Sequence, residues 1–297
     1  MHMKSTFLLS RRSVIAGIGL GLATNCWPVQ AALNQKANAR IAALEQQLGG
    51  RIGVLAVDTH NGARLAYRAD ERFAMCSTFK LLLAAAILAG VDRGEIKLAQ
   101  LVPYDSADLL DYAPVAKAHV AEGKLSVEAL AASIVEVSDN TAANLLLGLV
   151  GGPPGLTNYL RKLGDPITRL DRTETELNSN LLGDERDTTT PNAMIATMQR
   201  ILIGDALSSH SHNKLIEWMK LCSTGLERLR AGLPSDWIVG DKTGTGANGA
   251  VNDLAIVWPP KRAPILIAAY MSESTRTTAE LNAAHTKIGR MIVETFS

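Results

Sequence analysis

Ser77 and Lys80 are the two residues of this 297-residue chain whose types and spacing most clearly suggest chemistry. They lie at the start of an otherwise apolar stretch, MCSTFKLLLAAAILAG at residues 75–90, which predicts a buried helix. Residues three apart share a helix face, so the serine hydroxyl and the lysine amine can meet. Burial makes an amine easier to deprotonate, and a helix start offers backbone N–H groups to developing negative charge. The pattern predicts a serine nucleophile activated by a lysine.

The same spacing recurs at Ser211 and Lys214, so this motif alone does not identify an active site. Those two residues open an amphipathic segment in a polar setting, where we interpret the serine as a helix cap. Two further motifs accompany the first pair, SDN at residues 138–140 and KTG at residues 242–244. Each tripeptide is common in caps or turns, but the three motifs in this order are typical of active-site serine enzymes that react with penicillins.

Other kinds of site have weaker support in the sequence. A GxGxxG pattern at residues 244–249 precedes a predicted strand rather than a helix, which favours a hairpin turn over dinucleotide binding. His210 and His212 have no further ligands at metal-binding spacing, so we expect two surface histidines. Lysine plus arginine (30) nearly balance aspartate plus glutamate (29), without a basic stripe. We therefore expect no metal, no cofactor and no nucleic-acid partner.

The first 31 residues have the features of an export signal. Arg11 and Arg12 precede an apolar, small-residue run at 14–23, and the sequence VQA at 29–31 resembles a signal-peptidase site. The paired arginines indicate the twin-arginine route, and the apolar run is short for a membrane span. We expect a periplasmic or secreted mature protein without a membrane anchor.

Both ends of the mature chain are predicted to build one sheet. Five β-rich runs with short links favour an antiparallel sheet, and a helical segment lies at each end. The expected strands cover residues 51–58, 63–67, 237–243, 251–258 and 265–271, and the expected flanking helices cover residues 37–48 and 278–296. The predicted fold class is α+β.

The middle of the chain has a helical pattern and predicts an inserted all-helical domain. Its helices are expected at residues 78–89, 127–137, 141–150, 156–163, 191–203 and 213–220. We divide the chain into the signal (1–31), an α/β domain (32–69 with 221–297) and the helical domain (70–220). The polar stretch 169–191 has no clean period, and a loop of this length is usually functional or disordered.

That polar stretch contains RTETELN at residues 172–178, and with it the chain resembles the class A serine β-lactamases over essentially its whole mature length. The resemblance implies an α/β domain made from both chain ends, an inserted all-helical domain and an omega loop at 169–187. This agrees with the architecture expected from the elements alone. The resemblance also implies hydrolysis of the β-lactam ring of penicillins and cephalosporins through a serine acyl-enzyme, which confers antibiotic resistance.

The resemblance implies a role for each catalytic side chain. Ser77 would attack the β-lactam carbonyl, and either Lys80 or Glu174, the latter through a water, would take its proton. Glu174, helped by Asn178, would activate the water that releases the product. Ser138 would relay a proton to the departing ring nitrogen.

A second group of residues would bind the substrate. By resemblance, Lys242, Thr243 and Thr245 would hold its carboxylate, and Asn140 would hold its side-chain amide. The backbone N–H groups of Ser77 and Thr245 would form an oxyanion hole. The substrate-binding residues implied in this way, with Tyr112 as the aromatic wall of the pocket, are Tyr112, Asn140, Asn178, Arg228, Lys242, Thr243, Gly244 and Thr245.

Two departures from the family pattern leave the substrate spectrum open. Many members carry a carboxylate-binding arginine near the place where Val251 stands, and Arg228 matches an alternative arginine of other branches. Cys76, directly before Ser77, is similar to a cysteine found in the carbapenem-hydrolysing branch of the family. In that branch its partner cysteine follows the KTG motif, at the position where this chain has Gly246. The signature disulfide of that branch is therefore expected to be absent.

Two alternatives share the serine and lysine chemistry. A penicillin-binding peptidase would act on peptidoglycan, but Glu174 and Asn178 argue against it. A non-hydrolytic β-lactam receptor would stay acylated, and such sensors usually need a membrane-linked partner domain, which we do not find in the sequence. We expect a monomeric enzyme whose partners are small β-lactam substrates.

Overall fold

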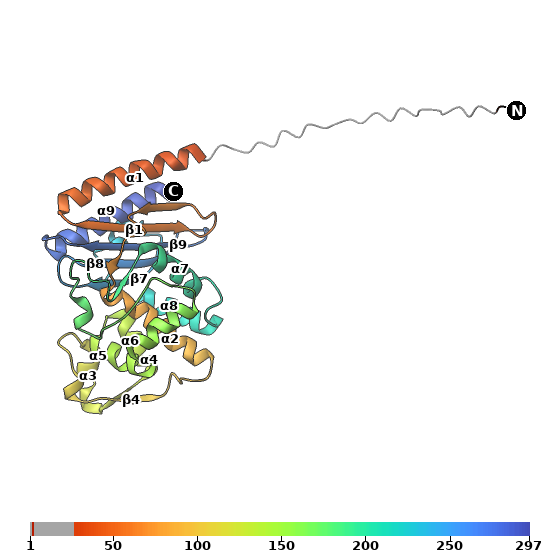
Figure 1. Ribbon diagram of the computed structural model, residues 1–297. Helices are drawn as coiled ribbons and strands as arrows, with labels where there is room; N and C mark the ends of the chain where they lie inside the picture. Colours follow the sequence, from red (N-terminus) through yellow and green to blue (C-terminus); the bar gives the residue numbers. More distant parts are fainter. Residues whose placement is uncertain (1, 3–26) are drawn as a thin grey trace.

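In the computed structural model, which describes residue 2 and residues 27–297, a five-stranded antiparallel sheet lies between two layers of helices (Figure 1). The strand order is β2-β1-β9-β8-β7, so strands from the two ends of the chain pair side by side. These strands are β1 (Arg51–Asp58), β2 (Arg64–Tyr67), β7 (Ile238–Thr245), β8 (Val251–Trp258) and β9 (Ile265–Ser272). The α+β fold class and the five-stranded antiparallel sheet expected from the sequence are confirmed.

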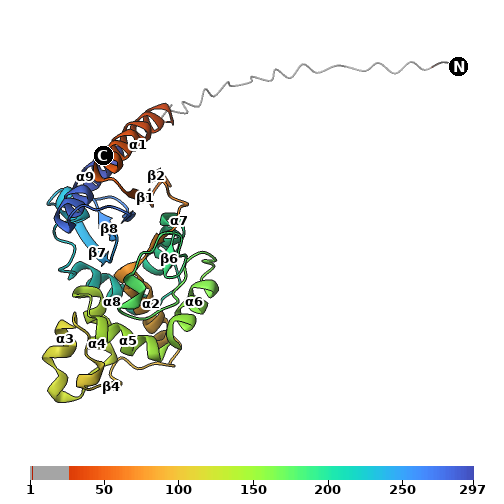
Figure 2. The same ribbon diagram turned by 60° about the vertical axis from the view of Figure 1, so that its left-hand side comes forward.

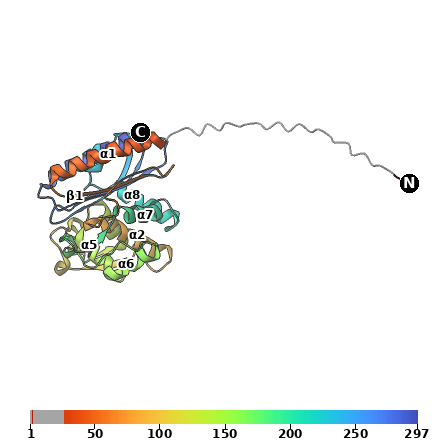
Figure 3. The same cartoon turned by 45° about the horizontal axis from the view of Figure 1, so that its top comes forward.

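The central strands are buried because helices cover both faces of the sheet. Every residue of β9 is buried, and in β8 only the last residue is partly exposed. Strands of this kind are continuous apolar runs, which made them visible in the sequence. On one face, α1 (Trp27–Leu48) and α9 (Thr278–Phe296) lie side by side (Figure 3). Ile41 and Ile288, both fully buried, belong to the apolar layer between these helices and the sheet.

The opposite face of the sheet is covered by helices arranged around α2 (Phe79–Asp92) (Figure 2). Every residue of α2 from Phe79 to Gly90 is buried, as expected for a helix that is apolar on all sides. The helices on this side are α3 (Pro114–Ala118), α4 (Val127–Glu136), α5 (Asn140–Leu149), α6 (Gly152–Lys162), α7 (Pro191–Leu202) and α8 (Ser209–Lys220), and of these α4, α5, α6 and α8 pack against α2. α7 and α8 also contact strands of the sheet.

Several short elements were not expected from the sequence. Two small antiparallel pairs join β3 (Phe73–Ala74) to β6 (Thr188–Thr189) and β4 (Leu101–Pro103) to β5 (Lys124–Ser126). Five 3-10 turns are η1 (Cys76–Thr78), η2 (Ser106–Asp108), η3 (Val120–Glu122), η4 (Glu176–Asn178) and η5 (Leu229–Gly232). The β3–β6 pair matters most, because it ties the segment before Ser77 to the end of the long polar loop.

Three helices begin four or more residues earlier than the sequence predicted. α1 begins at Trp27 rather than at residue 37, and residues 30–36 are exposed or partly exposed, so they carry no apolar stripe that could reveal the helix. α6 begins at Gly152 rather than at residue 156, with prolines in its first turn. A proline is tolerated there because the first N–H groups of a helix have no intrahelical partner.

The helix α8 also begins earlier, and this corrects our interpretation of Ser211. The N-cap is Ser208, whose Oγ accepts the Ser211 backbone N–H at 3.2 Å. Ser211 is buried in the first turn, and its own hydroxyl donates to Asp92 Oδ1 at 2.6 Å. Ser211 and Lys214 therefore lie inside the helix, and Ser211 joins it to the end of α2.

The export signal predicted for residues 1–31 lies almost entirely outside the described residues, and α1 begins within its last positions. None of the helices in the described part of the chain combines the length and the apolar composition that crossing a membrane requires.

Candidate active site

Ser77 is held at a tightly anchored junction. It lies in η1, which leads directly into α2, and the preceding residue Cys76 has a φ of 45°, a backbone conformation uncommon outside glycine. Asn252 on β8 donates its side-chain N–H groups to the carbonyls of Ala74 (2.9 Å) and Met75 (3.1 Å). The sheet therefore fixes the backbone that presents the Ser77 hydroxyl.

Lys80 is the centre of a buried polar group. Its Nζ donates to Ser77 Oγ at 3.0 Å and to the Ser138 carbonyl at 2.9 Å, and it lies 2.8 Å from Glu174 Oε1. The side chains of Lys80 and Glu174 are both 0% exposed. Burial lowers the pKa of Lys80, and the Glu174 carboxylate opposes that shift. A buried amine with a lowered pKa, bonded to a hydroxyl, is suited to accept that hydroxyl's proton.

Glu174 is fixed at both its side chain and its backbone. Ser77 Oγ donates to Glu174 Oε1 over 3.4 Å, and Asn178 Nδ2 donates to Oε2 at 2.6 Å. Asn144 on α5 accepts the Glu174 backbone N–H at 2.9 Å and donates to its carbonyl at 2.9 Å. Asn144 was missed in the sequence, although it lies four positions after Asn140 and so on the same helix face.

Ser138 lies between two lysines. Its backbone has a φ of 62°, and the next residue, Asp139, caps α5 by accepting the Ala142 N–H. Lys242 Nζ donates to Ser138 Oγ at 3.1 Å, and Lys80 Nζ lies 3.4 Å from the same oxygen. Burial lowers the pKa of Lys242 to about 7, and the neighbouring Lys80 charge acts in the same direction. A hydroxyl between two amines of lowered pKa can pass a proton to a third group.

A cavity of about 350 Å³ opens next to these groups. Its lining residues are Ser77, Tyr112, Ser138, Asn140, Asn178, Thr224, Arg228, Thr243, Gly244 and Thr245. Lys80, Glu174 and Lys242 lie buried behind this lining and bond to residues of it. The structure therefore brings all twelve predicted site residues to one place and adds Thr224, which no motif had indicated.

Two glycines allow close packing beside Ser77. A Cβ on Gly244 would lie 2.7 Å from the Met75 carbonyl and 3.2 Å from Ser77 N, so any larger residue would push β7 away. A Cβ on Gly246 would lie 2.6 Å from Cys76 Sγ. Cys76 is free and buried, in agreement with the expected absence of the disulfide.

Arg228 is more fully bonded than its expected role suggests. Its Nε donates to Asn282 Oδ1 at 2.9 Å, and Nη1 donates to the carbonyls of Gly244 (2.9 Å) and Asn252 (2.7 Å). Its Nη2 donates to Thr245 Oγ1 at 2.7 Å. A guanidinium has five N–H donors, so four are used by the described residues and one is left for the cavity. Most of this side chain therefore supports β7 rather than facing a ligand.

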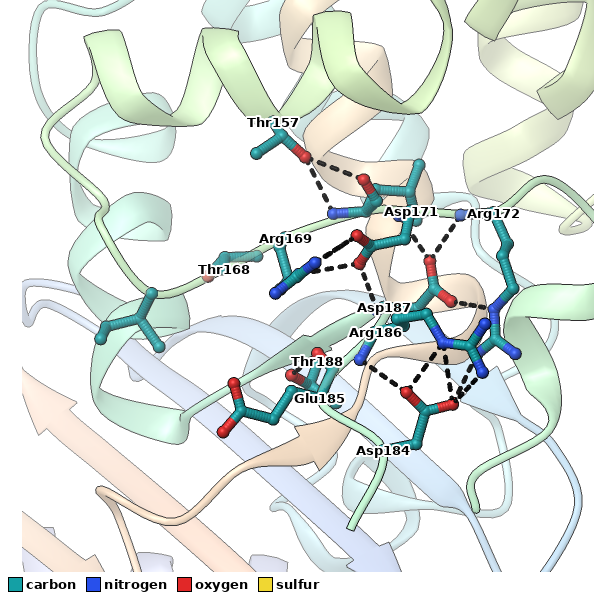
Figure 4. Close-up of polar contacts among 12 residues, drawn as sticks. Thr157, Thr168, Arg169, Asp171, Arg172, Asp184, Glu185, Arg186, Asp187 and Thr188 are labelled. Atoms are coloured by element: carbon teal, nitrogen blue, oxygen red, sulfur yellow. Dashed lines mark hydrogen bonds and ion pairs between the residues drawn. The ribbon is translucent and has the colours of Figure 1, made fainter. Parts of the chain in front are cut away.

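The loop that carries Glu174 is closed at its base by Asp187 (Figure 4). The Asp187 Oδ1 atom accepts the backbone N–H groups of Asp171 (2.7 Å) and Arg172 (2.9 Å), and Oδ2 accepts Arg172 Nε at 2.6 Å. The Asp187 N–H donates in turn to Asp171 Oδ2 at 3.0 Å. The ion pair of Arg172 and Asp187 is largely buried, with side-chain exposures of 16% and 0%.

The described residues contain no group of three or more His, Cys, Asp or Glu side chains that could hold a metal ion. His210 is exposed, as expected. His212 is partly buried and contacts the Leu202 carbonyl, so only one of the two is a surface residue.

Comparisons with known proteins agree with this geometry. The model of the β-lactamase enzyme family matches residues 36–296. The chain is 46% identical to β-lactamase AST-1 of Nocardia asteroides over 258 residues, covering 87% of this chain and 83% of the relative. It is 45% identical to β-lactamase CTX-M-8 of Citrobacter amalonaticus over 234 residues, covering 79% and 80%. Its fold matches the solved structure of an ancestral class A β-lactamase with a TM-score of 0.86 and 52% identity, covering 88% and 100% of the two chains.

Proposed function

The chain belongs to the class A β-lactamases and hydrolyses the β-lactam ring, and we propose that Ser77 is the nucleophile that forms its acyl-enzyme. The observation that carries this assignment is the buried contact of Ser77 Oγ with Lys80 Nζ (3.0 Å) and Glu174 Oε1 (3.4 Å) beside a cavity. Family membership brings with it the antibiotic resistance that such enzymes confer. It also removes the support for the peptidase and receptor alternatives.

In acylation, Ser77 Oγ attacks the β-lactam carbonyl and the ring C–N bond breaks. Lys80 and Glu174 both reach the Ser77 hydroxyl, so each is a candidate base for its proton. We infer that Ser138 delivers a proton to the ring nitrogen, because its hydroxyl lies between Lys80 and Lys242. In this route each proton moves across about one hydrogen bond.

The oxyanion formed in this step needs donors close to Ser77. We assign this role to the backbone N–H groups of Ser77 and Thr245, which lie on the two segments that Gly244 allows to approach each other. Each such donor lowers the barrier by about 3–4 kcal/mol in comparable enzymes.

In deacylation, Glu174 is the base that deprotonates the attacking water. Its carboxylate is buried, held by Asn178 and paired with Lys80, so its oxygens have a fixed position next to Ser77. A water held by Glu174 and Asn178 would attack the ester carbonyl, and the bond to Ser77 Oγ would break. Penicillins and cephalosporins both contain the β-lactam ring that this mechanism hydrolyses.

Substrate binding uses the rest of the cavity lining. Thr243 and Thr245 line the side where we place the substrate carboxylate, with the Lys242 amine buried behind them, and Arg228 contributes the N–H that it has left. Asn140 has its amide oxygen occupied by Lys80 at 2.5 Å, which leaves its N–H groups for the substrate's side-chain carbonyl. Tyr112, 51% exposed, forms the outer wall.

The test is to replace Glu174 by alanine and to follow the protein by mass spectrometry with a penicillin. We expect the intact mass to show an acyl adduct that persists, because the attack of Ser77 remains possible while water activation is lost. Glu176→Ala is the matched control, since Glu176 lies on the same loop and is exposed. Normal turnover by Glu174→Ala would remove Glu174 from the mechanism.

We further propose that the mature enzyme is a periplasmic or secreted monomer, exported through the twin-arginine route with cleavage after Ala31. The arginine pair and the small residues before that position support export. For the domains we propose an α/β unit (32–69 with 221–297) and a helical unit (70–220) that contains the omega loop at 169–187. Size-exclusion chromatography tests the monomeric state, and N-terminal sequencing of exported protein tests the cleavage site.

A further inference from the structure

Thr224 lines the active-site cavity but belongs to no motif that the sequence displayed. Its Oγ1 lies 2.6 Å from Thr243 Oγ1 on β7, and Cys222 Sγ lies 3.3 Å from the same Thr224 atom. Cys222 and Thr243 are both buried, with 3% and 4% exposure. A chain of three hydrogen-bonding groups, which we call the hydroxyl relay (Cys222, Thr224 and Thr243), therefore runs from a buried thiol to the cavity wall.

The hydrogen bonds of the hydroxyl relay can run in two directions. The direction decides whether Thr243 presents its proton or its lone pairs to the cavity. Each hydroxyl has one proton to donate and two lone pairs that accept. If Thr224 donates to Thr243, the Thr243 proton remains available to a ligand. If Thr243 donates to Thr224, its lone pairs face the cavity, and these repel a carboxylate, which at neutral pH is an acceptor only.

The buried thiol favours the first direction. Burial raises the pKa of Cys222, so the group remains a protonated S–H that can donate to Thr224. Thr224 then accepts from the thiol and has its own proton free for Thr243. In the opposite direction the Thr224 proton would point to sulfur, which is only a weak acceptor, or into the cavity, where Thr224 rather than Thr243 would meet a ligand.

The neighbouring threonine on β7 is arranged by the same principle. Thr245 Oγ1 accepts from Arg228 Nη2 at 2.7 Å. A guanidinium can only donate, so the Thr245 proton is directed elsewhere. Thr243 and Thr245 both line the cavity, and behind their hydroxyls lie the Thr224 hydroxyl and the Arg228 guanidinium respectively.

We propose that Thr224 is a positioning residue for binding of the substrate carboxylate, acting through Thr243. It donates to Thr243 and thereby points the Thr243 proton into the cavity. The carboxylate of a β-lactam then meets two oriented hydroxyl donors, Thr243 and Thr245, in addition to Lys242. This inference rests on the proposed function, because it assigns a binding role within the same cavity.

Thr224→Val tests the proposal, because valine keeps the shape of threonine and removes the hydroxyl. With a chromogenic cephalosporin we expect KM to rise about fivefold and kcat to stay within about twofold, the pattern for loss of uniform binding. Thr224→Ser should restore the KM of the parent enzyme. Thr275→Val is the matched control, since Thr275 is exposed and lies outside the cavity lining, and its KM should not change.

A double-mutant cycle with Thr243→Val separates action through Thr243 from a direct contact. If Thr224 acts through Thr243, the double variant should have the same KM as Thr243→Val alone. Effects that multiply would overturn the proposal, as would an unchanged KM in Thr224→Val. Cys222→Ala supplies a second test should Thr224→Val unfold, with an expected rise in KM of about twofold; no rise would count against the relay.

The parent enzyme distinguishes failure of this inference from failure of the proposed function. Absence of multiple turnover by the parent enzyme would overturn the proposed function and this inference with it. Normal turnover by the parent enzyme, together with an unaffected Thr224→Val, would overturn the positioning role alone.

Discussion

Asn144 offers the sharpest test of how the fold supports catalysis. It lies on α5, 30 residues before Glu174 in the chain, and it holds the Glu174 backbone from both sides with two hydrogen bonds of 2.9 Å. Asn144→Leu keeps the approximate shape of the side chain and removes both bonds. The Ser77–Lys80 contact involves neither bond, so acylation should be affected less than deacylation.

The size of the effect follows from those two bonds. Each contributes about 1 kcal/mol net, and partners left unpaired in a partly buried position cost more, so the loss is about 2–4 kcal/mol. Because about 1.4 kcal/mol corresponds to a tenfold change in an equilibrium constant, a loss of about 2 kcal/mol raises the ratio of displaced to native loop conformations about 30-fold. For a chain of this size, 2 kcal/mol lowers Tm by about 4–8 °C.

Rapid-mixing kinetics with a chromogenic cephalosporin would measure the consequence. Asn144→Leu should show a burst of product equal to the enzyme concentration, followed by turnover slowed at least about tenfold because Glu174 is displaced. Asn213→Leu on α8 is the matched control, because Asn213 is exposed. A variant that turned over at the parent rate and kept its Tm would refute the idea that Asn144 positions Glu174.

Three further predictions concern β7 and the residue that follows it. Because burial lowers the pKa of Lys242 to about 7, the amine loses its charge as pH rises, so kcat/KM should fall on the alkaline side; Lys242→Arg should move that fall to higher pH in a pH–rate profile. Gly244→Ala places a Cβ 2.7 Å from the Met75 carbonyl and should cut kcat/KM by about tenfold or more, measured at equal folded fraction. Gly246→Cys should form a disulfide with Cys76, seen by non-reducing peptide mapping, but its Cβ would also lie 2.7 Å from the Asn178 carbonyl, so the unfolding free energy should rise by less than the usual gain of about 2–4 kcal/mol.

The elements predicted correctly are those whose burial leaves a pattern in the sequence. β9 and α2 are apolar along their length because they are covered on every side, so their composition alone marks them. The first turns of α1, α6 and α8 were missed because residues there are exposed, proline-containing or rich in candidate caps. Short pairs such as β3–β6 depend on contacts between distant segments, which no local pattern can show.

The site residues also fall into two groups, those that belong to sequence motifs and those that do not. Ser77, Lys80 and Glu174 belong to motifs, so their types and order were sufficient to single them out. Asn144 and Thr224 are common uncharged residues whose importance arises only when folding places them 2.6–2.9 Å from another site residue. Asn252 supports the nucleophile from β8 in the same way. The sequence therefore indicated the candidate reacting groups and Asn178, which holds Glu174, but not Asn144, Thr224 or Asn252.

The two buried lysines of the site differ in their partners. Lys80 is paired with Glu174 at 2.8 Å, whereas among the described residues the Lys242 amine bonds only to the Ser138 hydroxyl and the Thr243 carbonyl. A buried cation without a counter-charge is destabilising, which is why its pKa falls to about 7. If Lys242 lies next to the substrate carboxylate, as we propose, the substrate supplies the missing negative charge, and the electrostatic cost present in the empty enzyme becomes attraction in the complex. We therefore expect the cavity to prefer anions because the charge behind its wall lacks a nearby carboxylate.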